Sequence, residues 1–208
     1  MASAPNKKRV SRAGRRPVIT ATLSATVTTL LADGERWTDL SIERICAESG
    51  VARSTFYLFF EDQGHLLTEL ADDALEAITG AGEGWWSLPR DATRADLEKA
   101  VEDIFVAYAE HGLLLTAVVE AAAYDGRVRE HLEDSLEHSF AAVTQHITTA
   151  QNDGWMDPGL DADTIAHWLS WMGESGLRAL VHRGERPTRR LIEAYAGIVW
   201  NVLYTFDR

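Results

Sequence analysis

The sequence predicts an all-α protein in which a small N-terminal domain of three helices precedes a larger domain of six helices. Apolar residues recur at spacings of three and four along most of the chain, which is the period of an amphipathic helix. Glycine and proline clusters separate these periodic segments, as they separate neighbouring helices. No two segments show the alternation of polar and apolar residues that indicates a pair of strands. We therefore expect a flexible basic arm at residues 1–16, a first domain at 17–62 and a second domain at 63–208.

The first domain begins with a helix predicted from Pro17 to Ala32. Proline is tolerated in a first turn because its missing N–H would have no partner there. Ser41 is a suitable N-cap for a short helix from Ile42 to Glu48, and Gly50 suits the left-handed residue that ends such a helix. A third helix is expected from about Ala52 to Phe59. Two short helices joined by so brief a turn are typical of a helix-turn-helix.

The second domain is expected to contain six longer helices. The glycine-rich residues 80–84 predict a loop after the first of them, with Trp85 and Trp86 attached to it. Asp91 is a suitable N-cap for the next helix, which His111 and Gly112 are expected to interrupt. The six helices are predicted at about residues 63–78, 91–110, 112–123, 126–151, 162–183 and 188–206.

The bulk composition is that of a folded, soluble protein, with 46% hydrophobic and 25% charged residues. The longest apolar stretches, at 113–119 and 194–200, are shorter than the roughly 18 residues of a membrane-spanning helix. No apolar segment follows the basic N-terminus, which argues against a secretory signal. Cys46 is the only cysteine, so it cannot form an internal disulfide, and we interpret it as a small core residue. The sequence therefore indicates a cytoplasmic protein.

Charge is unevenly distributed along the chain, whose formal net charge is −12. Residues 1–60 contain nine lysines and arginines and five acidic residues, a net charge of +4, which leaves −16 for the remainder. A basic end on an acidic body is expected when only that end meets nucleic-acid phosphates. A charged tail that only improves solubility would produce the same asymmetry.

The third helix of the first domain is the candidate recognition helix of the helix-turn-helix. Its first turn presents Arg53, Ser54 and Thr55. Arginine grips guanine with two hydrogen bonds, serine bonds either kind of base, and the threonine methyl contacts thymine. The hydroxyl of Tyr57 suits a backbone phosphate, and Ser41 provides a second phosphate anchor at the positive end of its helix. The alternative is that this helical pair is only a corner of an α-bundle.

At these residues the sequence resembles the TetR family of transcriptional regulators, over about residues 17–70. The matching pattern is an isoleucine, a turn, an aromatic pair and two later apolar residues in register: Ile45, Ser49-Gly50-Val51, Thr55-Phe56-Tyr57, Phe60 and Leu66. The C-terminal part is similar to the ethionamide-resistance repressor branch, on Met172-Gly-Glu174, Gly184-Glu-Arg-Pro187 and Tyr204. The resemblance implies a homodimer that binds a double-stranded DNA operator through the first domain. It also implies that residues 63–208 bind a small molecule and form the dimer.

The chain departs from the family pattern where the family contacts phosphate. Ala52 replaces the usual capping serine, Phe59 the usual histidine or tyrosine, and Gln63-Gly64 the usual lysine-glutamate. Each replacement removes a donor or a cation. The basic arm would compensate by entering the minor groove or following the backbone, so Arg15 and Arg16 join the predicted DNA contacts.

Tryptophan is frequent in the second domain, which holds six of the seven in the chain. The resemblance implies that helices between about residues 91 and 180 surround a cavity. A mostly apolar lining with few polar groups would suit a lipophilic ligand. Filling of the core is the alternative for any one of these side chains. The predicted ligand contacts are Trp86, Phe105, Tyr108, Tyr124, Phe140, Trp168, Trp171, Met172 and Glu174.

The last two predicted helices carry apolar residues on more than one face, with Trp168 beside Leu169 in the first and Ile198 beside Val199 in the second. A helix buried on two sides suits the four-helix dimer interface that the resemblance implies. A two-fold dimer would place two recognition helices on the half-sites of a palindromic operator.

His131 and His138 lie two turns apart on an acidic predicted helix. This spacing is too wide for two ligands of one metal ion without a third element, so a solvated acidic face is the simpler interpretation. The sequence contains no glycine-rich phosphate loop, no GxSxG turn and no HExxH motif. We therefore expect no metal, no cofactor and no catalysis.

These observations favour a ligand-responsive transcriptional regulator, most simply a repressor that leaves its operator when a lipophilic molecule binds. The alternative is an all-α small-molecule-binding protein whose DNA-binding domain has degenerated. The replacements at Ala52, Phe59 and Gln63 favour this alternative, whereas Arg53, Tyr57 and the basic arm argue against it.

Overall fold

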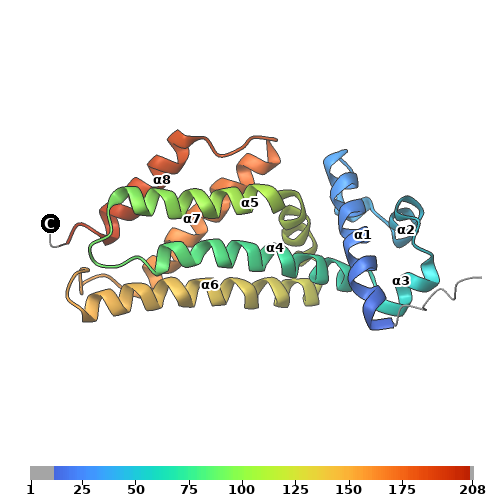
Figure 1. Ribbon diagram of the computed structural model, residues 1–208, viewed down its shortest axis with the longest axis horizontal. Coiled ribbons are helices and arrows are strands. Elements are labelled where there is room, and N and C mark those ends of the chain that lie inside the picture. The colour runs from blue at the N-terminus through green and yellow to red at the C-terminus, as the bar shows by residue number, and fades with distance from the viewer. Residues whose placement is uncertain (1–11, 207–208) are drawn as a thin grey trace, which may run out of the picture.

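The computed structural model describes residues 12–206, and all regular elements in this range are helices (Figure 1). This confirms the predicted all-α class. The described elements are α1 (Arg12–Ala32), the short 3-10 helix η1 (Trp37–Asp39), α2 (Ile42–Ser49), α3 (Arg53–Phe59), α4 (Gln63–Trp86), α5 (Arg94–Ala122), α6 (Gly126–Asn152), α7 (Ala162–His182) and α8 (Arg189–Leu203).

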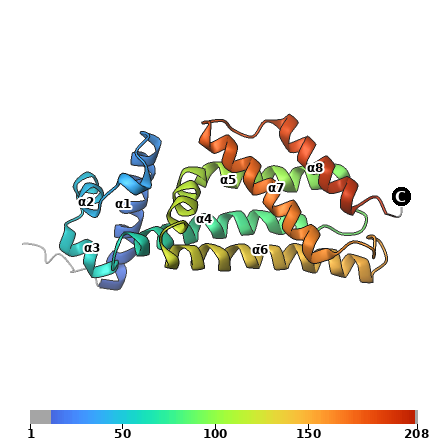
Figure 2. The same cartoon turned by 180° about the vertical axis from the view of Figure 1, so that it is seen from behind.

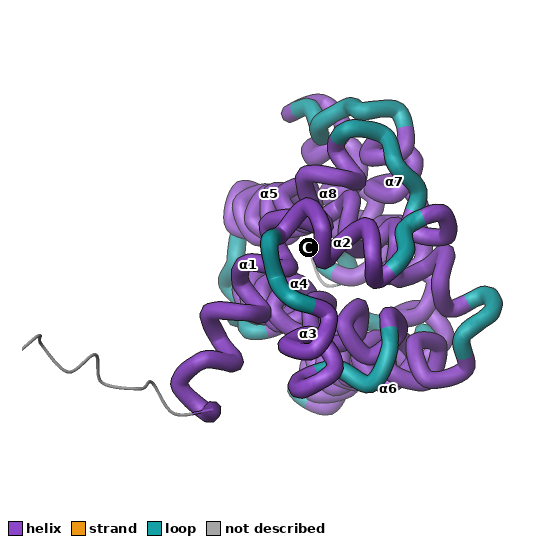
Figure 3. The backbone as a smooth tube through the Cα atoms, turned by 90° about the vertical axis from the view of Figure 1, so that its right-hand side faces the viewer, coloured by secondary structure: helices purple, strands orange, loops and turns teal. Residues whose placement is uncertain are grey.

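The helices form a small head, made of α1 to α3, and a longer body, made of α4 to α8 (Figures 1 and 2). α4 leads out of the head and runs along the body. α5 lies in the middle of the body and packs against α4, α6, α7 and α8. Figure 3 views the molecule along its long axis from the head, and the C-terminus lies at the opposite end.

The apolar residues of the head belong to a core that continues into the body, and the Phe56 side chain is fully buried in it. Its ring meets Tyr57 edge-on at a centroid distance of 5.4 Å and lies 5.3 Å from the ring of Phe60. Cys46 lies in the same core with 6% of its surface exposed, and burial raises the pKa of its thiol. The interpretation of Cys46 as a small core residue is thus confirmed.

α1 is longer than the sequence predicts, because it begins at Arg12 and contains Pro17. The expected first turn at Pro17 is therefore wrong, and residues 12–16, assigned to the arm, are helical. Pro17 is the sixth residue of α1, so its missing N–H leaves one carbonyl of the first turn without its partner in the helix. The part of the predicted arm before Arg12 lies outside the described residues.

α4 continues through the glycine-rich residues 80–84, where a loop was expected. The physical reason lies in Gly82, since a Cβ atom there would overlap the indole of Trp86 one turn later. Glycine thus makes room for a large ring on the helix surface, and the prediction of a loop is wrong. The following helix, α5, is capped by Thr93 rather than Asp91, in a reciprocal capping box with Asp96.

α5 is one continuous helix, so the break expected at His111 and Gly112 is wrong, and the body has five helices instead of six. A Cβ atom at Gly112 would collide with the side chain of Val181 on α7. Glycine inside a helix costs about 1 kcal/mol relative to alanine. Here it allows α5 and α7 to approach closely.

α5 is also long and apolar enough to cross a membrane by length and composition, with a mean hydropathy of 1.4 over its most apolar window. The sequence predicts that every apolar stretch is too short to span a membrane. This prediction is correct only for stretches that contain no charged residue. α5 packs against four other helices of the body, so its apolar character is that of a core helix.

Candidate DNA-binding surface and ligand cavity

The turn between α2 and α3 has the geometry of a helix-turn-helix. Gly50 ends α2 with φ of 68°, in the left-handed region that glycine adopts without strain. The Val51 N–H donates to Ser49 Oγ over 3.3 Å and holds the turn. Ile45 and Val51 are buried in the core of the head.

The exposed face of α3 carries three of the predicted DNA contacts: Arg53, Ser54 and Tyr57. The Arg53 guanidinium lies 2.7 Å from Glu43 Oε1 of α2 and 6.0 Å from the centre of the Tyr57 ring. Thr55 is half-buried at the edge of this face. Since Arg53 and Glu43 are both more than half exposed, the guanidinium can exchange this carboxylate for DNA.

Ser41 caps α2, and its Oγ accepts the N–H of Arg44 over 3.1 Å. The hydroxyl proton of Ser41 remains available to a phosphate oxygen. On α1, Arg15 is exposed, whereas Arg16 forms an ion pair with Glu69 of α4 and lies over the ring of Phe60.

The positions that depart from the family pattern belong to the scaffold of the head. Phe59 is a core residue with 7% of its surface exposed. Gln63 donates from Nε2 to the Trp37 carbonyl oxygen over 3.2 Å. Ala52 provides no side-chain cap to α3.

The start of α6 is attached to the corner between α3 and α4, which we call the head–body joint (Glu61, Asp62, Gly64, Asp125 and Arg127). Arg127 of α6 pairs with Asp62, the N-cap of α4, and lies 3.5 Å from Glu61. A Cβ atom at Gly64 would collide with the carboxylate of Asp125, the N-cap of α6. Burial acts to raise the pKa of Asp62, but the His65 N–H and Arg127 outweigh it and hold that pKa below its usual value.

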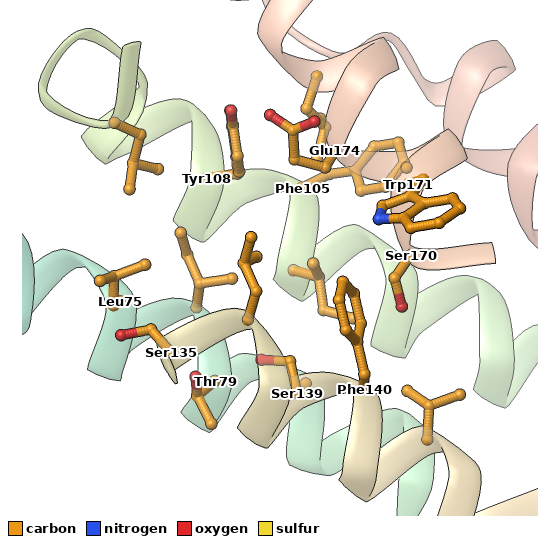
Figure 4. Close-up of a pocket in the computed structure, with 18 of the residues that line it drawn as sticks. Leu75, Thr79, Phe105, Tyr108, Ser135, Ser139, Phe140, Ser170, Trp171 and Glu174 are labelled. Carbon is orange, nitrogen blue, oxygen red and sulfur yellow. The ribbon is translucent and has the colours of Figure 1, made fainter. Parts of the chain in front are cut away.

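The body encloses a cavity of about 330 Å³ between α4, α5, α6 and α7, with Tyr195 contributed by α8 (Figure 4). Most of the lining is apolar. Six of the nine predicted ligand contacts line it: Trp86, Phe105, Tyr108, Phe140, Trp171 and Glu174.

The other three predicted contacts do not line the cavity, and their assignment to its wall is wrong. Tyr124, in the turn between α5 and α6, is 60% exposed. Trp168 and Met172 lie on the outer face of α7, where they are 62% and 37% exposed. The Trp168 ring meets the Trp171 ring edge-on at a centroid distance of 5.6 Å, so Trp168 borders the face of α7 that lines the cavity without lining it.

Several polar lining residues were missed by sequence reasoning. Thr79 of α4 lies beyond the predicted end of its helix. Ser135 and Ser139 of α6 line the cavity, and so does Arg178 of α7. The two serines share a face with Leu132 and Leu136, and small hydroxyls on an apolar helix face are the signal that would have identified them.

A second group of polar side chains gathers around Glu174. Arg178 Nε lies 3.0 Å from Glu174 Oε1. The buried Tyr108 hydroxyl points toward Glu174 in Figure 4. Burial, and then the charge and hydrogen bond of Glu174, raise the pKa of Tyr108 far above its ordinary value. Tyr108 is therefore a neutral donor.

The fold is similar to that of solved bacterial regulators. A putative TetR-family transcriptional regulator from Mesorhizobium loti matches with a TM-score of 0.71 at 16% identity, covering 94% of this chain and 100% of that one. The transcriptional regulator FadR from Bacillus subtilis, solved in complex with stearoyl-CoA, matches with a TM-score of 0.69 at 16% identity, covering 90% of this chain and 99% of that one. At these identities the likeness establishes the fold.

The sequence comparisons decide the family. The HTH-type transcriptional regulator EthR of Mycolicibacterium smegmatis is 25% identical over 160 residues, which cover 76% of this chain and 73% of that protein. The family model described as "Transcriptional regulator EthR, C-terminal domain" matches residues 97–205, more than half of the chain. The chain belongs to the EthR branch of the TetR family. It is a ligand-responsive transcriptional regulator, and the resemblance read from the sequence is confirmed.

In this TetR-family body α7 and α8 carry exposed apolar side chains, which we call the α7/α8 face (Trp168, Met172, Leu191 and Ile198). Its four side chains are between 37% and 62% exposed. On the inner side of the same helices, the Tyr195 hydroxyl donates to the Leu169 carbonyl over 2.8 Å. Exposed apolar residues gathered on neighbouring helices favour a protein partner over water.

Gly82→Ala is expected to destabilise this TetR-family chain by about 1–3 kcal/mol, because the new methyl group displaces the indole of Trp86 from the cavity wall. Urea unfolding followed by tryptophan fluorescence measures the change. Gly80→Ala in the same helix is the matched control, since a Cβ atom there meets nothing within 4 Å. The control is expected to gain up to about 1 kcal/mol, and equal behaviour of the two variants would contradict the assigned packing.

Proposed function

We propose that the chain represses transcription as a homodimer on a palindromic operator, and that a lipophilic small molecule in the cavity releases it. Residues 17–62 read the DNA, and residues 63–208 bind the effector and hold the dimer. The protein acts in the cytoplasm. Its effector binds without a metal or cofactor.

The observation that carries the proposal is that α4 and α6 line the cavity and also meet at the head–body joint. Leu75 and Thr79 of α4 and Ser139 of α6 line the cavity, and the two helices meet again at the head–body joint through Asp62 and Arg127. A ligand that changes the spacing of α4 and α6 would therefore change the placement of the head. Ligand and DNA would then prefer different conformations, and each would weaken binding of the other.

The DNA contacts we propose are Ser41, Arg53, Ser54, Thr55, Tyr57, Arg15 and Arg16. The exposed face of α3 supports the base contacts of Arg53 and Ser54. The free hydroxyl proton of Ser41 and the exposed ring of Tyr57 support phosphate contacts. Arg16 would leave Glu69 when it meets a phosphate.

Fluorescence anisotropy with the protein's own upstream DNA tests the proposal, at two salt concentrations and beside a scrambled duplex. Tight, salt-sensitive and sequence-specific binding by two protomers, or a multiple of two, is expected. If the protein binds both duplexes equally weakly, the sequence that it prefers is then sought by selection from random DNA. Failure of that selection to enrich any sequence would reject a DNA-reading head.

A second candidate function is ligand binding by a chain whose head no longer reads DNA. The buried position of Phe59 and the bond of Gln63 to Trp37 favour it, since neither side chain is placed to bind phosphate. Arg53 separates the two candidates, because only a DNA-reading head depends on its side chain.

Arg127→Ala is expected to weaken operator binding roughly three- to thirtyfold, because it releases the ion pair that ties α6 to the N-cap of α4. Anisotropy titration with the operator measures the loss. Arg129→Ala is the matched control on the same helix, since Arg129 donates to the Ala122 carbonyl and does not touch the head. Equal affinities for the two variants would show that the joint does not position the head.

A further inference from the structure

Most polar groups of the cavity lie on two opposite walls, while Ser170 lies near Trp171 (Figure 4). One wall carries the hydroxyls of Thr79, Ser135 and Ser139, from α4 and α6. The other carries Tyr108 of α5 and Glu174 of α7. Apolar side chains make up most of the remaining lining.

The second wall, which contains Glu174, has no net charge. Among the described lining residues, Glu174 and Arg178 are the only two that carry full charges, and they pair with each other over 3.0 Å. The hydroxyl of Tyr108 is directed toward the Glu174 carboxylate (Figure 4). Ser175 Oγ also donates to Glu174 Oε2, over 3.4 Å. A carboxylate has about four acceptor positions, so these three neighbours leave room for one donor from a ligand.

The first wall is neutral and offers hydroxyl groups. Ser135 donates to the carbonyl oxygen of His131 over 2.9 Å, one turn earlier in α6. Thr79 and Ser139 form no side-chain hydrogen bond with another described residue, so both can donate to an oxygen atom of a ligand.

We propose that the effector is an uncharged molecule with an apolar frame, which donates a hydrogen bond to Glu174 and accepts hydrogen bonds from Thr79 and Ser139. The inference rests on the proposed role of the cavity as the effector site. An anionic group would lose its hydration beside Glu174, while Arg178 is already neutralised. At about 330 Å³ the cavity is at the small end of the range for drug-sized ligands.

Isothermal titration of the full-length protein tests this with six probes: the primary amide, methyl ester and carboxylate of 4-phenylbutanoic acid and of decanoic acid. Each set keeps one apolar frame and changes only the polar group. We expect the amide to bind most tightly, because it supplies both a donor and an acceptor. The carboxylate is expected to bind at least about tenfold more weakly, which corresponds to about 1.4 kcal/mol. The ester, which has no donor for Glu174, is expected between them.

Glu174→Gln gives a sharper test, because it removes the negative charge and leaves Arg178 without its partner. The carboxylates are then expected to gain about tenfold in affinity and to overtake the amides. Glu137→Gln on the exposed side of α6 makes the same change of charge outside the cavity and is expected to change neither affinity.

Two results would overturn the inference and leave the effector cavity in place: carboxylates that bind the unaltered protein as tightly as amides, or a preference that Glu174→Gln does not change. If none of the six probes binds, the assignment of the cavity as the effector site is wrong, and so is this inference. Operator binding, measured separately, is independent of either outcome.

Discussion

Arg53→Ala is expected to abolish the preference of the protein for its operator over unrelated DNA. The side chain lies on the exposed face of α3, and loss of a two-bond contact with guanine costs roughly ten- to a hundredfold in affinity at each half-site. Both half-sites of a dimer lose the contact, so the two effects multiply. Anisotropy titrations with operator and scrambled duplexes measure the ratio of the two affinities.

Arg53→Lys separates base reading from charge, because lysine keeps the cation but cannot form the paired bonds. We expect it to bind both duplexes with similar affinity. Lys99→Ala removes a cation near the start of α5, where Lys99 pairs with Asp103, and is the charge-matched control. An unchanged preference in Arg53→Ala would exclude Arg53 from base recognition and favour the ligand-binding protein with a degenerate head.

Ile198→Glu is expected to convert the proposed dimer into monomers. Ile198 lies on the α7/α8 face and is 47% exposed in the protomer, so glutamate remains solvated when the protomer is alone. In a two-fold interface the charge occurs twice, and each uncompensated buried charge costs about 3–5 kcal/mol. Light scattering after size-exclusion chromatography measures the mass of the variant. Its affinity for the operator is also expected to fall by at least about a hundredfold, because one protomer reaches only one half-site.

Val106→Glu is the control for this variant. Val106 is 49% exposed on α5, outside the α7/α8 face, and takes the same substitution at nearly the same exposure. The control is expected to remain dimeric and to bind the operator normally. A dimeric Ile198→Glu protein would place the interface elsewhere on the body.

The head was predictable because its signals are local. Ser41 caps a helix within three residues, Gly50 sets a turn by its own φ, and the faces of α3 follow from its period. What local signals could not reveal is that Arg16 and Arg53 already have carboxylate partners, because Glu69 belongs to another helix and Glu43 to the helix before the turn.

The body was predicted less completely, and its glycines explain why. Gly82 and Gly112 have the local appearance of helix breakers, yet both lie within helices because a ring or a neighbouring helix occupies the space of a side chain. Trp168 and Trp171 illustrate the same limit for the cavity. The two residues are equally aromatic and three apart, but only Trp171 lines it.

The sequence by itself determined the helical class, the helix-turn-helix and its exposed side chains, since each depends on spacing and on caps within a few residues. The tertiary structure decided which helices are continuous, which aromatic residues enclose the cavity, and how Arg178 neutralises Glu174 opposite the hydroxyls of Thr79 and Ser139. It also joined Asp62 to Arg127, which lie 65 residues apart in the chain. The physical reason is that hydrogen bonds within a helix are set by its own sequence, whereas close approach, cavity shape and charge pairing depend on helices that meet only after folding.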